Sequence, residues 1–410
     1  MLTGALLLWT ACSGADSMFS YWLYRAFNSR DPGEQVEFYT NALVAWTVPD
    51  GAKNRAVAFN NRGLAYHDNK DEDHALQDYD RAIRLQPDYE AAFCNRGDAF
   101  RQKKDFARAI QDYDKAIALK PGYEAAYYGR GSAFDEKKDV DRAIQDYSKA
   151  LEIKPDWEAA FCSRGNAFRE KDDIVHALQD YSVVIELNPN YAEAYCGRGL
   201  VYVMKKDFKQ GLADCGKAIG LKPNSADAYR CRGSVHAGQK DFDKAIEDFS
   251  RAIALKADEA AFYLDRGSAY RSQRDYDRAI ADLLKSVALD PKSPRSYNSL
   301  GYSYYESRKY QEAVETFIKG LNIHRDADTW AGLALALLGQ GHADKALAAF
   351  RKCVKLDPAF AEGAKVIKGK DAYAYTKAQL KAIDALADLL KKATPPPSPA
   401  PGSRKGPPRA

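Results

Sequence analysis

An Arg-Gly dipeptide returns at intervals of 34 residues along this chain of 410 residues. The copies begin at Arg62, Arg96, Arg130, Arg164, Arg198, Arg232 and Arg266. Proline keeps the same interval at Pro87, Pro121, Pro155, Pro189 and Pro223, and returns at Pro291 after Ala257 in the intervening copy. A fixed period of this length indicates a solenoid, in which each repeat buries its apolar face against its neighbours.

Each repeat has the pattern of two short helices separated by a turn. In the first helix of the first repeat, Phe59, Gly63 and Tyr66 are spaced by four and three residues, which places them on one face of a helix. In the second helix, Ala75, Tyr79 and Ala82 have the same spacing and also lie on one face. Pro87 then ends the helix, because proline cannot continue it. Gly63 and Ala75 are small because the two helices are expected to touch there, with Tyr79 filling the space beside them.

This arrangement of aromatic, glycine, alanine and proline positions resembles the tetratricopeptide repeat, particularly the Asn-Arg-Gly type found in bacterial exported proteins. The pattern extends through Ala56–Pro358 in nine copies, of which the last two diverge. The resemblance implies an all-α fold, an α-solenoid of about nine helix-turn-helix repeats in a right-handed superhelix with capping helices at both ends. It also implies a protein that binds other proteins and is not an enzyme.

The repeats divide the chain into five segments. Residues 1–15 are a candidate signal or lipoprotein segment, and residues 16–55 are expected to form N-terminal capping helices as a degenerate repeat. The nine repeats of 34 residues occupy 56–360, and C-terminal capping helices are expected over 361–393. Within this last segment, Thr376 to Lys392 has one apolar stripe and the rest polar, as an amphipathic helix does. The proline-rich residues 394–410 are predicted to be a disordered tail.

The arginine of each Arg-Gly pair has an aspartate sixteen residues later, from Asp78 after Arg62 to Asp282 after Arg266. In the eighth and ninth repeats both charges are lost together, to Leu300 and Thr316 and to Leu333 and Ala349. We therefore predict a partly buried Arg–Asp bridge, either between the two helices of each repeat or between neighbouring repeats.

Charge and composition narrow the possible partners. The net charge is +4, and the tail alone contributes Arg404, Lys405 and Arg409. A body so close to neutral argues against nucleic acid as the main partner. The six histidines and seven cysteines show no metal-binding spacing, and no catalytic constellation is evident. We expect no cofactor and no metal, and we expect Cys94, Cys162 and Cys196 to be free thiols that fill core space.

The resemblance also places a partner-binding groove on the first helices of successive repeats. Carried over position by position, the groove residues are Asn60, His67, Asp68, Asp98, Arg101, Tyr128, Asp135, Arg169, Leu200, Met204, Arg230, Arg271, Tyr302 and Tyr305. Leu200 and Met204 make an apolar spot among polar neighbours, which is typical of an interaction surface. The alternative is that these two side chains pack on neighbouring helices.

The N-terminal stretch Leu2–Ala11 is apolar but much shorter than the ~20 residues that span a bilayer. It has the character of a secretory signal, and Leu8–Cys12 resembles a lipoprotein processing site. The sequence therefore favours an exported protein of the cell envelope or periplasm, with a cytoplasmic protein as the alternative. Any membrane association is expected through such an N-terminal lipid anchor.

The leading functional prediction is a non-catalytic adaptor or scaffold that binds a peptide or protein in the groove. Two alternatives remain open. The chain could self-assemble through its terminal helices, or it could be the regulatory subunit of an enzyme encoded elsewhere. The fold predicts a groove and does not identify its ligand.

Overall fold

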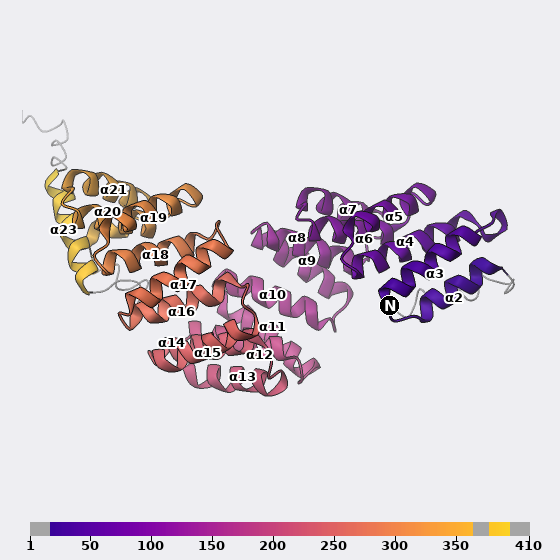
Figure 1. The fold of residues 1–410 in the computed structure, drawn as a ribbon, viewed down its shortest axis with the longest axis horizontal. Coiled ribbons are helices and arrows are strands. Elements are labelled where there is room, and N and C mark those ends of the chain that lie inside the picture. Colours follow the sequence, from indigo (N-terminus) through magenta and orange to yellow (C-terminus); the bar gives the residue numbers. More distant parts are fainter. Residues whose placement is uncertain (1–16, 364–376, 394–410) are drawn as a thin grey trace, which may run out of the picture. The chain divides into compact units, whose positions relative to one another are not determined.

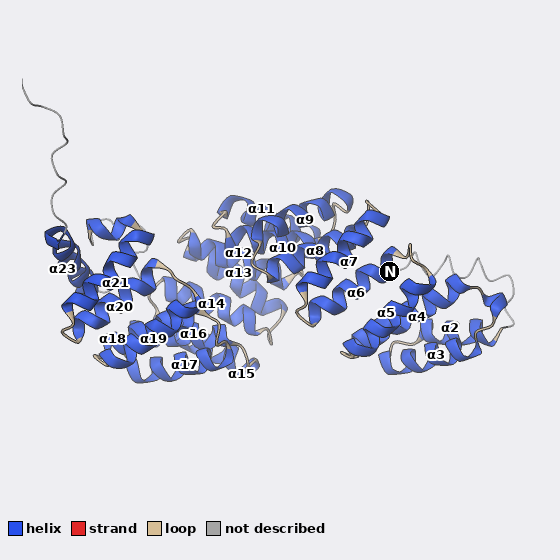
Figure 2. Cartoon of the chain, turned by 90° about the horizontal axis from the view of Figure 1, so that it is seen from above, coloured by secondary structure: helices blue, strands red, loops and turns tan. Residues whose placement is uncertain are grey.

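The computed structural model describes residues 17–363 and 377–393, and every regular element in these ranges is a helix (Figures 1 and 2). The all-helical architecture predicted from the repeat period is confirmed. The chain divides into two compact units, residues 1–205 and 206–410. None of the described helices is long and apolar enough to cross a membrane.

Unit one (residues 1–205) begins with two helices that precede the repeats and continues with the helices of the first four repeats and the first helix of the fifth. Its elements are α2 (Met18–Asn28), α3 (Pro32–Ala45), the 3-10 turn η1 (Val48–Asp50), α4 (Ala52–Asp68), α5 (Glu72–Leu85), α6 (Glu90–Gln102), α7 (Phe106–Leu119), α8 (Glu124–Glu136), α9 (Val140–Ile153), α10 (Glu158–Glu170), α11 (Ile174–Leu187) and α12 (Ala192–Met204). Consecutive helices pack as hairpins, and each hairpin packs on the next.

Unit two (residues 206–410) begins with the second helix of the fifth repeat. Its elements are α13 (Phe208–Leu221), α14 (Ala226–Gly238), α15 (Phe242–Leu255), α16 (Ala260–Ser272), α17 (Tyr276–Leu289), α18 (Pro294–Glu306), α19 (Tyr310–Ile323), α20 (Ala327–Gly339), α21 (Ala343–Leu356), the 3-10 turn η2 (Pro358–Glu362) and α23 (Lys377–Ala393). The apolar stripe of α23, with Ile383 and Leu386, is buried against α20 and α21.

A recurring turn separates the two helices of each repeat. In the first repeat, Lys70 takes a left-handed backbone conformation with φ of 61°. Asp71 follows, and its carboxylate accepts a hydrogen bond from the backbone N–H of His74 at 3.2 Å, which caps the N-terminus of α5. The same cap recurs in later repeats at Asp105, Asp139, Asp173, Asp207, Asp241 and Asp275.

The core is built from aromatic rings packed against glycine. Tyr79 of α5 is fully buried, and a Cβ added to Gly63 of α4 would lie 2.6 Å from its ring. The ring of Tyr113 meets glycine in two repeats, Gly97 of its own and Gly129 of the next. These contacts explain why both positions are glycine, since any side chain there would displace the ring.

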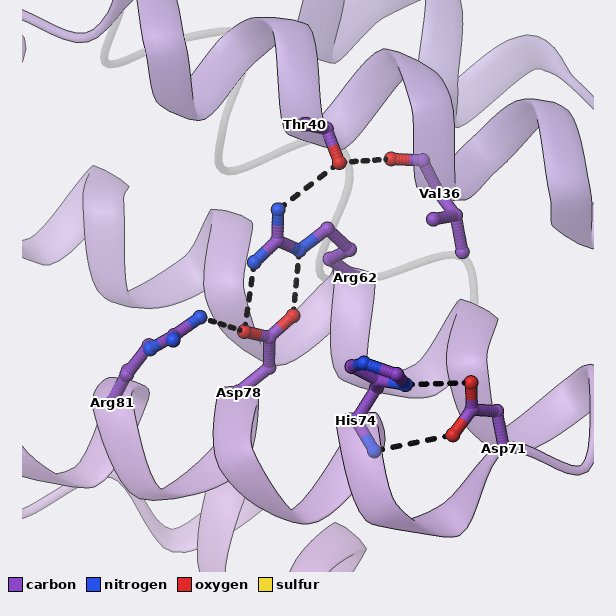
Figure 3. Close-up of polar contacts among 7 residues, drawn as sticks. All are labelled: Val36, Thr40, Arg62, Asp71, His74, Asp78 and Arg81. Carbon is purple, nitrogen blue, oxygen red and sulfur yellow. Dashed lines mark hydrogen bonds and ion pairs between the residues drawn. The ribbon is translucent and has the colours of Figure 1, made fainter.

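The predicted Arg–Asp bridge is present (Figure 3). Arg62 donates from Nε and Nη2 to the two carboxylate oxygens of Asp78, at 2.6 and 2.9 Å. Its Nη1 donates to Thr40 of the preceding hairpin at 3.0 Å. The same bidentate pair forms at Arg96–Asp112, Arg130–Asp146, Arg164–Asp180, Arg232–Asp248 and Arg266–Asp282.

The arginine joins neighbouring repeats as well as the two helices of its own repeat. Nη1 of Arg96 donates to Asp80 of the preceding repeat at 2.6 Å, and Nη1 of Arg164 donates to Ser148 at 3.0 Å. Of the two options that the sequence left open, the predicted Arg–Asp pair forms between the two helices of one repeat, and the contact to the preceding repeat is made with a different residue. These guanidinium groups fix a hairpin and also hold that hairpin to the one before it.

The cysteines differ from the sequence-based expectation in one place. Cys215 of α13 and Cys231 of α14 form a disulfide with Cα atoms 5.7 Å apart, a pair that the sequence did not predict. Their two positions are those of Tyr113 and Gly129 in earlier repeats, where a ring meets a glycine. Cys94 and Cys162 are buried free thiols, as expected, and burial raises the pKa of Cys162 to about 12.

Candidate functional site

The first helices of successive repeats lie beside one another within each unit. In unit one α4, α6, α8, α10 and α12 are in contact in that order, and in unit two α14, α16, α18 and α20 are. We call the surface formed by the predicted groove positions of these helices the first-helix face.

In the N-terminal part of the first-helix face of unit one, the predicted residues differ in how accessible their side chains are. Asn60 is buried, and its side-chain oxygen accepts a hydrogen bond from Asn95 of α6 at 2.9 Å. His67 is half-buried and its Nδ1 lies 2.8 Å from Glu72. Asp68 is exposed. Of the three predicted residues here, Asp68 is therefore the most accessible to a partner.

A charged network lies across α6 and α8. Arg101 donates to Glu136 at 2.7 Å, and its guanidinium lies 3.8 Å from Asp98. The hydroxyl of Tyr113 donates to Asp98 at 2.7 Å. Burial raises the pKa of the Asp98 carboxyl, while the hydrogen bond from Tyr113 and the charge of Arg101 oppose that rise. Asp98 and Arg101, predicted separately, are thus brought together.

Aromatic and polar groups continue the face across α8 and α10. The hydroxyl of Tyr128 is 3.2 Å from Ser163 Oγ, and its ring lies 4.7 Å from the ring of Trp157, measured between centroids. Asp135 is half-buried, and both burial and the nearby Glu170 raise its pKa. Tyr128 is held on two sides, which fixes the orientation of its ring.

Arg169 of α10 extends the polar row. Its Nη2 is 3.5 Å from the side-chain oxygen of Asn166, which also accepts a hydrogen bond from Tyr181 at 2.7 Å. Leu200 and Met204 of α12, the last helix of unit one, are half-buried. They are neither sealed in the core nor fully exposed, so part of each side chain remains available for contact.

The first-helix face of unit two has its own paired charges. Arg230 donates to Asp265 at 2.7 Å. Arg271 lies 3.6 Å from Glu306, which also accepts a hydrogen bond from Gln379 of α23 at 3.1 Å. Burial raises the pKa of Glu306, and the charge of Arg271 opposes that rise. The C-terminal helix therefore contributes a polar group to this face.

The two predicted tyrosines of unit two differ in accessibility. Tyr302 is buried, and its hydroxyl donates to the backbone carbonyl of Asp328 at 3.1 Å. Tyr305 is half-buried beside Tyr310, with ring centroids 5.7 Å apart. Tyr305 is therefore the more exposed of the two.

Several contacts of the face follow a spacing of 35 residues that the sequence reasoning missed. Asn60–Asn95, Arg101–Glu136, Tyr128–Ser163 and Arg230–Asp265 all have this separation. This separation is one residue longer than the repeat period. A residue on the first helix of one repeat therefore contacts the first helix of the next repeat one position further along than its own equivalent. A search for complementary polar residues 35 apart would have found Asn95, Ser163 and Asp265.

Three arginines at the same repeat position have a buried N–H without a hydrogen-bond partner. They are Arg101 and Arg169 at Nε, and Arg271 at Nη1, which lies 3.6 Å from Glu306, just beyond hydrogen-bond distance. A buried donor left unpaired costs about 1–3 kcal/mol.

Among the described residues, no group of histidine, cysteine or acidic side chains could hold a metal ion. The face instead presents fixed guanidinium, carboxylate, amide and phenol groups with a small apolar end at α12. Such groups recognise the side chains and backbone of a peptide.

Comparison with known proteins agrees with this architecture. Models of the tetratricopeptide repeat match residues 56–89, 94–156, 207–260, 231–294, 264–328 and 327–360, and a model of the TPR repeat matches 165–206. A search among curated protein sequences found no match.

Two solved structures with TM-scores above 0.5 share the fold of this chain. A tetratricopeptide repeat protein from Parabacteroides merdae ATCC 43184 is 19% identical with a TM-score of 0.54, covering 60% of this chain and 98% of that one. The Cut9–Hcn1 hetero-tetramer of the APC/C matches at 15% identity and a TM-score of 0.54, covering 85% and 81%. YrrB, a TPR protein with an unusual peptide-binding site, matches at 24% identity and a TM-score of 0.37, covering 44% and 92%.

The matched repeats cover most of the sequence, and each coincides with helical hairpins of the structure. The protein therefore belongs to the tetratricopeptide-repeat family.

Proposed function

We propose that this protein is a non-catalytic adaptor that holds a peptide or protein segment against the first-helix face of unit one. Tetratricopeptide repeats commonly mediate protein–protein interactions and are typically non-catalytic. The observation that supports this site most directly is the polar row from Asp98 to Arg169, which ends in the half-buried Leu200 and Met204.

The side chains of this row are held before a ligand arrives. Arg101 is fixed by Glu136, and Tyr128 by Ser163 and Trp157. Ordering a long side chain on binding costs about 0.5–1.5 kcal/mol, so side chains already held save that cost. Arginine and tyrosine are also the residue types that most often carry binding energy.

The proposed site can be tested with substitutions at Leu200 and Met204, the apolar residues at the α12 end of the first-helix face. Leu200→Glu combined with Met204→Glu should remove an apolar contact without touching the Arg–Asp bridges. Val175→Glu is the matched control, because Val175 is an exposed apolar residue of α11 and is outside the first-helix face. Leu200→Gln with Met204→Gln provides a milder second variant.

The native chain and the three variants would be used for affinity capture from native cells, with chemical cross-links mapped on the captured proteins. We expect discrete proteins with the native chain and the Val175 control, cross-linked near α10 and α12, and their loss with the Leu200 and Met204 variants. Equal capture by all four chains, with cross-links elsewhere, would reject this site.

We also propose that the protein is exported to the cell envelope. The apolar Leu2–Ala11 stretch supports this, and so does the disulfide Cys215–Cys231, because disulfides persist mainly in oxidising compartments. Cell fractionation and the mass of the mature N-terminus would test it. Recovery of the chain in the cytoplasm with both thiols reduced would contradict export.

A further inference from the structure

Helix α2, at the N-terminal end of unit one (Figure 1), exposes several large apolar side chains on its outward face. Its exposed side chains include Met18, Tyr21, Tyr24 and Phe27, with exposed fractions of 58%, 48%, 63% and 55%. At the helical angle of about 100° per residue, these four side chains lie within one half of the helix circumference. We call these four residues the α2 outer face.

The opposite side of α2 is its packing side. Phe19 and Ala26 are buried, and Phe19 packs against Ala42 of α3 and Ala58 of α4. The helix therefore carries large apolar side chains on both sides, with Arg25 and Asn28 among those of the outer side, whereas a helix with one side in water usually keeps that side mostly polar. The outer face is not needed to hold α2 in place.

The C-terminal capping helix shows the contrast. α23 buries Ile383, Leu386 and Ala387, and its exposed side carries Lys377, Lys381, Asp384, Asp388 and Lys391. A terminal element of a solenoid needs a polar outer side to stay soluble. α23 meets this requirement and α2 does not.

We propose that the α2 outer face binds the surface of a lipid bilayer. Tyrosine and phenylalanine favour the membrane–water interface, where the ring is buried and the hydroxyl remains hydrated. Two polar residues, Arg25 and Asn28, lie within the same half of the helix and are exposed. Arg25 donates to the hydroxyl of Tyr21 at 3.2 Å, so these groups suit the hydrated depth of the interface.

The position of α2 in the sequence supports the same occupant. The apolar stretch Leu2–Ala11 ends shortly before Ser17, the residue that caps α2. The intervening residues 12–16 can span at most about 18 Å when extended. A membrane that received the apolar stretch would thus lie within reach of the α2 outer face.

A second copy of the chain fits this face less well. α2 has 11 residues and is therefore about 16 Å long. A strip of that length and about 10 Å width is far smaller than the roughly 800 Å² per partner of a stable interface. Insertion into lipid needs no such area, since binding grows with each buried apolar side chain.

The charges near the α2 outer face predict which lipid composition is sufficient for membrane binding. Arg25 and Arg30 are offset by Asp31 and Glu34 at the start of α3. Binding should therefore depend on apolar insertion and not on anionic headgroups, and vesicles of phosphatidylcholine alone should be enough.

The test is flotation of the purified full-length chain with phosphatidylcholine vesicles. We expect the native chain to float with the vesicles, and Tyr24→Asp with Phe27→Asp to lower the bound fraction about tenfold or more. Val175→Asp, an exposed apolar residue far along the sequence, is the control and should float like the native chain. Circular dichroism should show equal helix content in all chains, and Tyr24→Ser with Phe27→Ser serves if the aspartate pair does not fold.

Two results would overturn the proposal. One is loss of flotation with Leu6→Asp and Leu7→Asp but not with the α2 variants, which would assign lipid binding to the N-terminal stretch alone. The other is a dimer in light scattering that the α2 variants dissociate, without vesicle binding by any chain. That would assign the face to a second copy.

Discussion

Gly129 of α8 lies against the ring of Tyr113 in the preceding repeat, so that a Cβ on Gly129 would be 2.5 Å from Cε1 of the ring. Gly129→Ala should therefore force the ring or the helix to move and destabilise unit one by about 1–3 kcal/mol. Gly216→Ala is the control, because no atom lies within 4 Å of a Cβ at that position of α13. That change should be neutral or stabilising by up to about 1 kcal/mol. Urea denaturation of both variants would check the prediction, and equal effects would contradict it.

The bridge between Arg164 and Asp180 should behave as a coupled pair. Asp180 is almost fully buried and Arg164 is one-fifth exposed. Arg164→Leu leaves the carboxylate stranded and should cost about 3 kcal/mol. Arg164→Leu combined with Asp180→Leu should cost clearly less than the sum of the two single changes. A double-mutant cycle measures this, and strictly additive free energies would rule out the pairing.

The exposed pair Lys149–Glu152 provides the comparison for that cycle. Both side chains are about half exposed or more, and their atoms are 2.6 Å apart. Water screens such a pair, so its coupling energy should stay below about 1 kcal/mol. The two cycles together separate the effect of burial from that of distance.

Reduction should destabilise unit two through Cys215–Cys231. The bridge joins residues 16 apart in sequence, for which loop-closure entropy predicts about 3 kcal/mol. The melting temperature should fall when a reductant is added to the native chain, and the Cys215→Ala and Cys231→Ala double variant should not respond. Alkylation followed by mass spectrometry identifies the bonded pair. A native chain that melts identically with and without reductant would refute a stabilising role.

The stability of unit one should depend on pH through Asp98. Because burial raises the pKa of this carboxyl, the folded chain keeps the proton at pH values where the unfolded chain has lost it. Asp98 therefore lowers stability as the pH rises from about 3.9 through its folded pKa. The free energy of unfolding of the native chain, relative to Asp98→Asn, should fall over that range. Parallel pH profiles for the two chains would contradict the assignment.

Much of the hairpin architecture could be predicted because the same residue pattern recurs in many repeats of the sequence. The interval between Arg62 and Arg96 gives the repeat length, and the joint loss of Arg and Asp at Leu300 and Thr316 identifies the bridge. Repeated comparison within one chain supplied information that a single copy lacks.

Other features were not predictable in the same way. Cys215 and Cys231 come from different repeats. Their pairing can be predicted only once it is known that the buried ring of one repeat, such as Tyr113, contacts the glycine of the next repeat, such as Gly129, because the two cysteines occupy these positions. The exposure of Tyr302 also depends on other helices, since its ring packs in the apolar cluster with Phe317 and its hydroxyl donates to the backbone of Asp328. Contacts between repeats depend on helix packing, which the repeat period alone does not specify.

The spacing of the arginine contacts bears on how such a chain could lengthen or shorten. Arg96 contacts Asp80 sixteen residues before it and Asp112 sixteen residues after it. Removal of residues 124–157, one whole period, would therefore bring Arg164 to Asp114, the group that Arg130 now contacts. A junction of this kind regenerates its contacts when a whole repeat is removed, so gene duplication or loss of whole repeats could change the size of this protein while the same packing is kept.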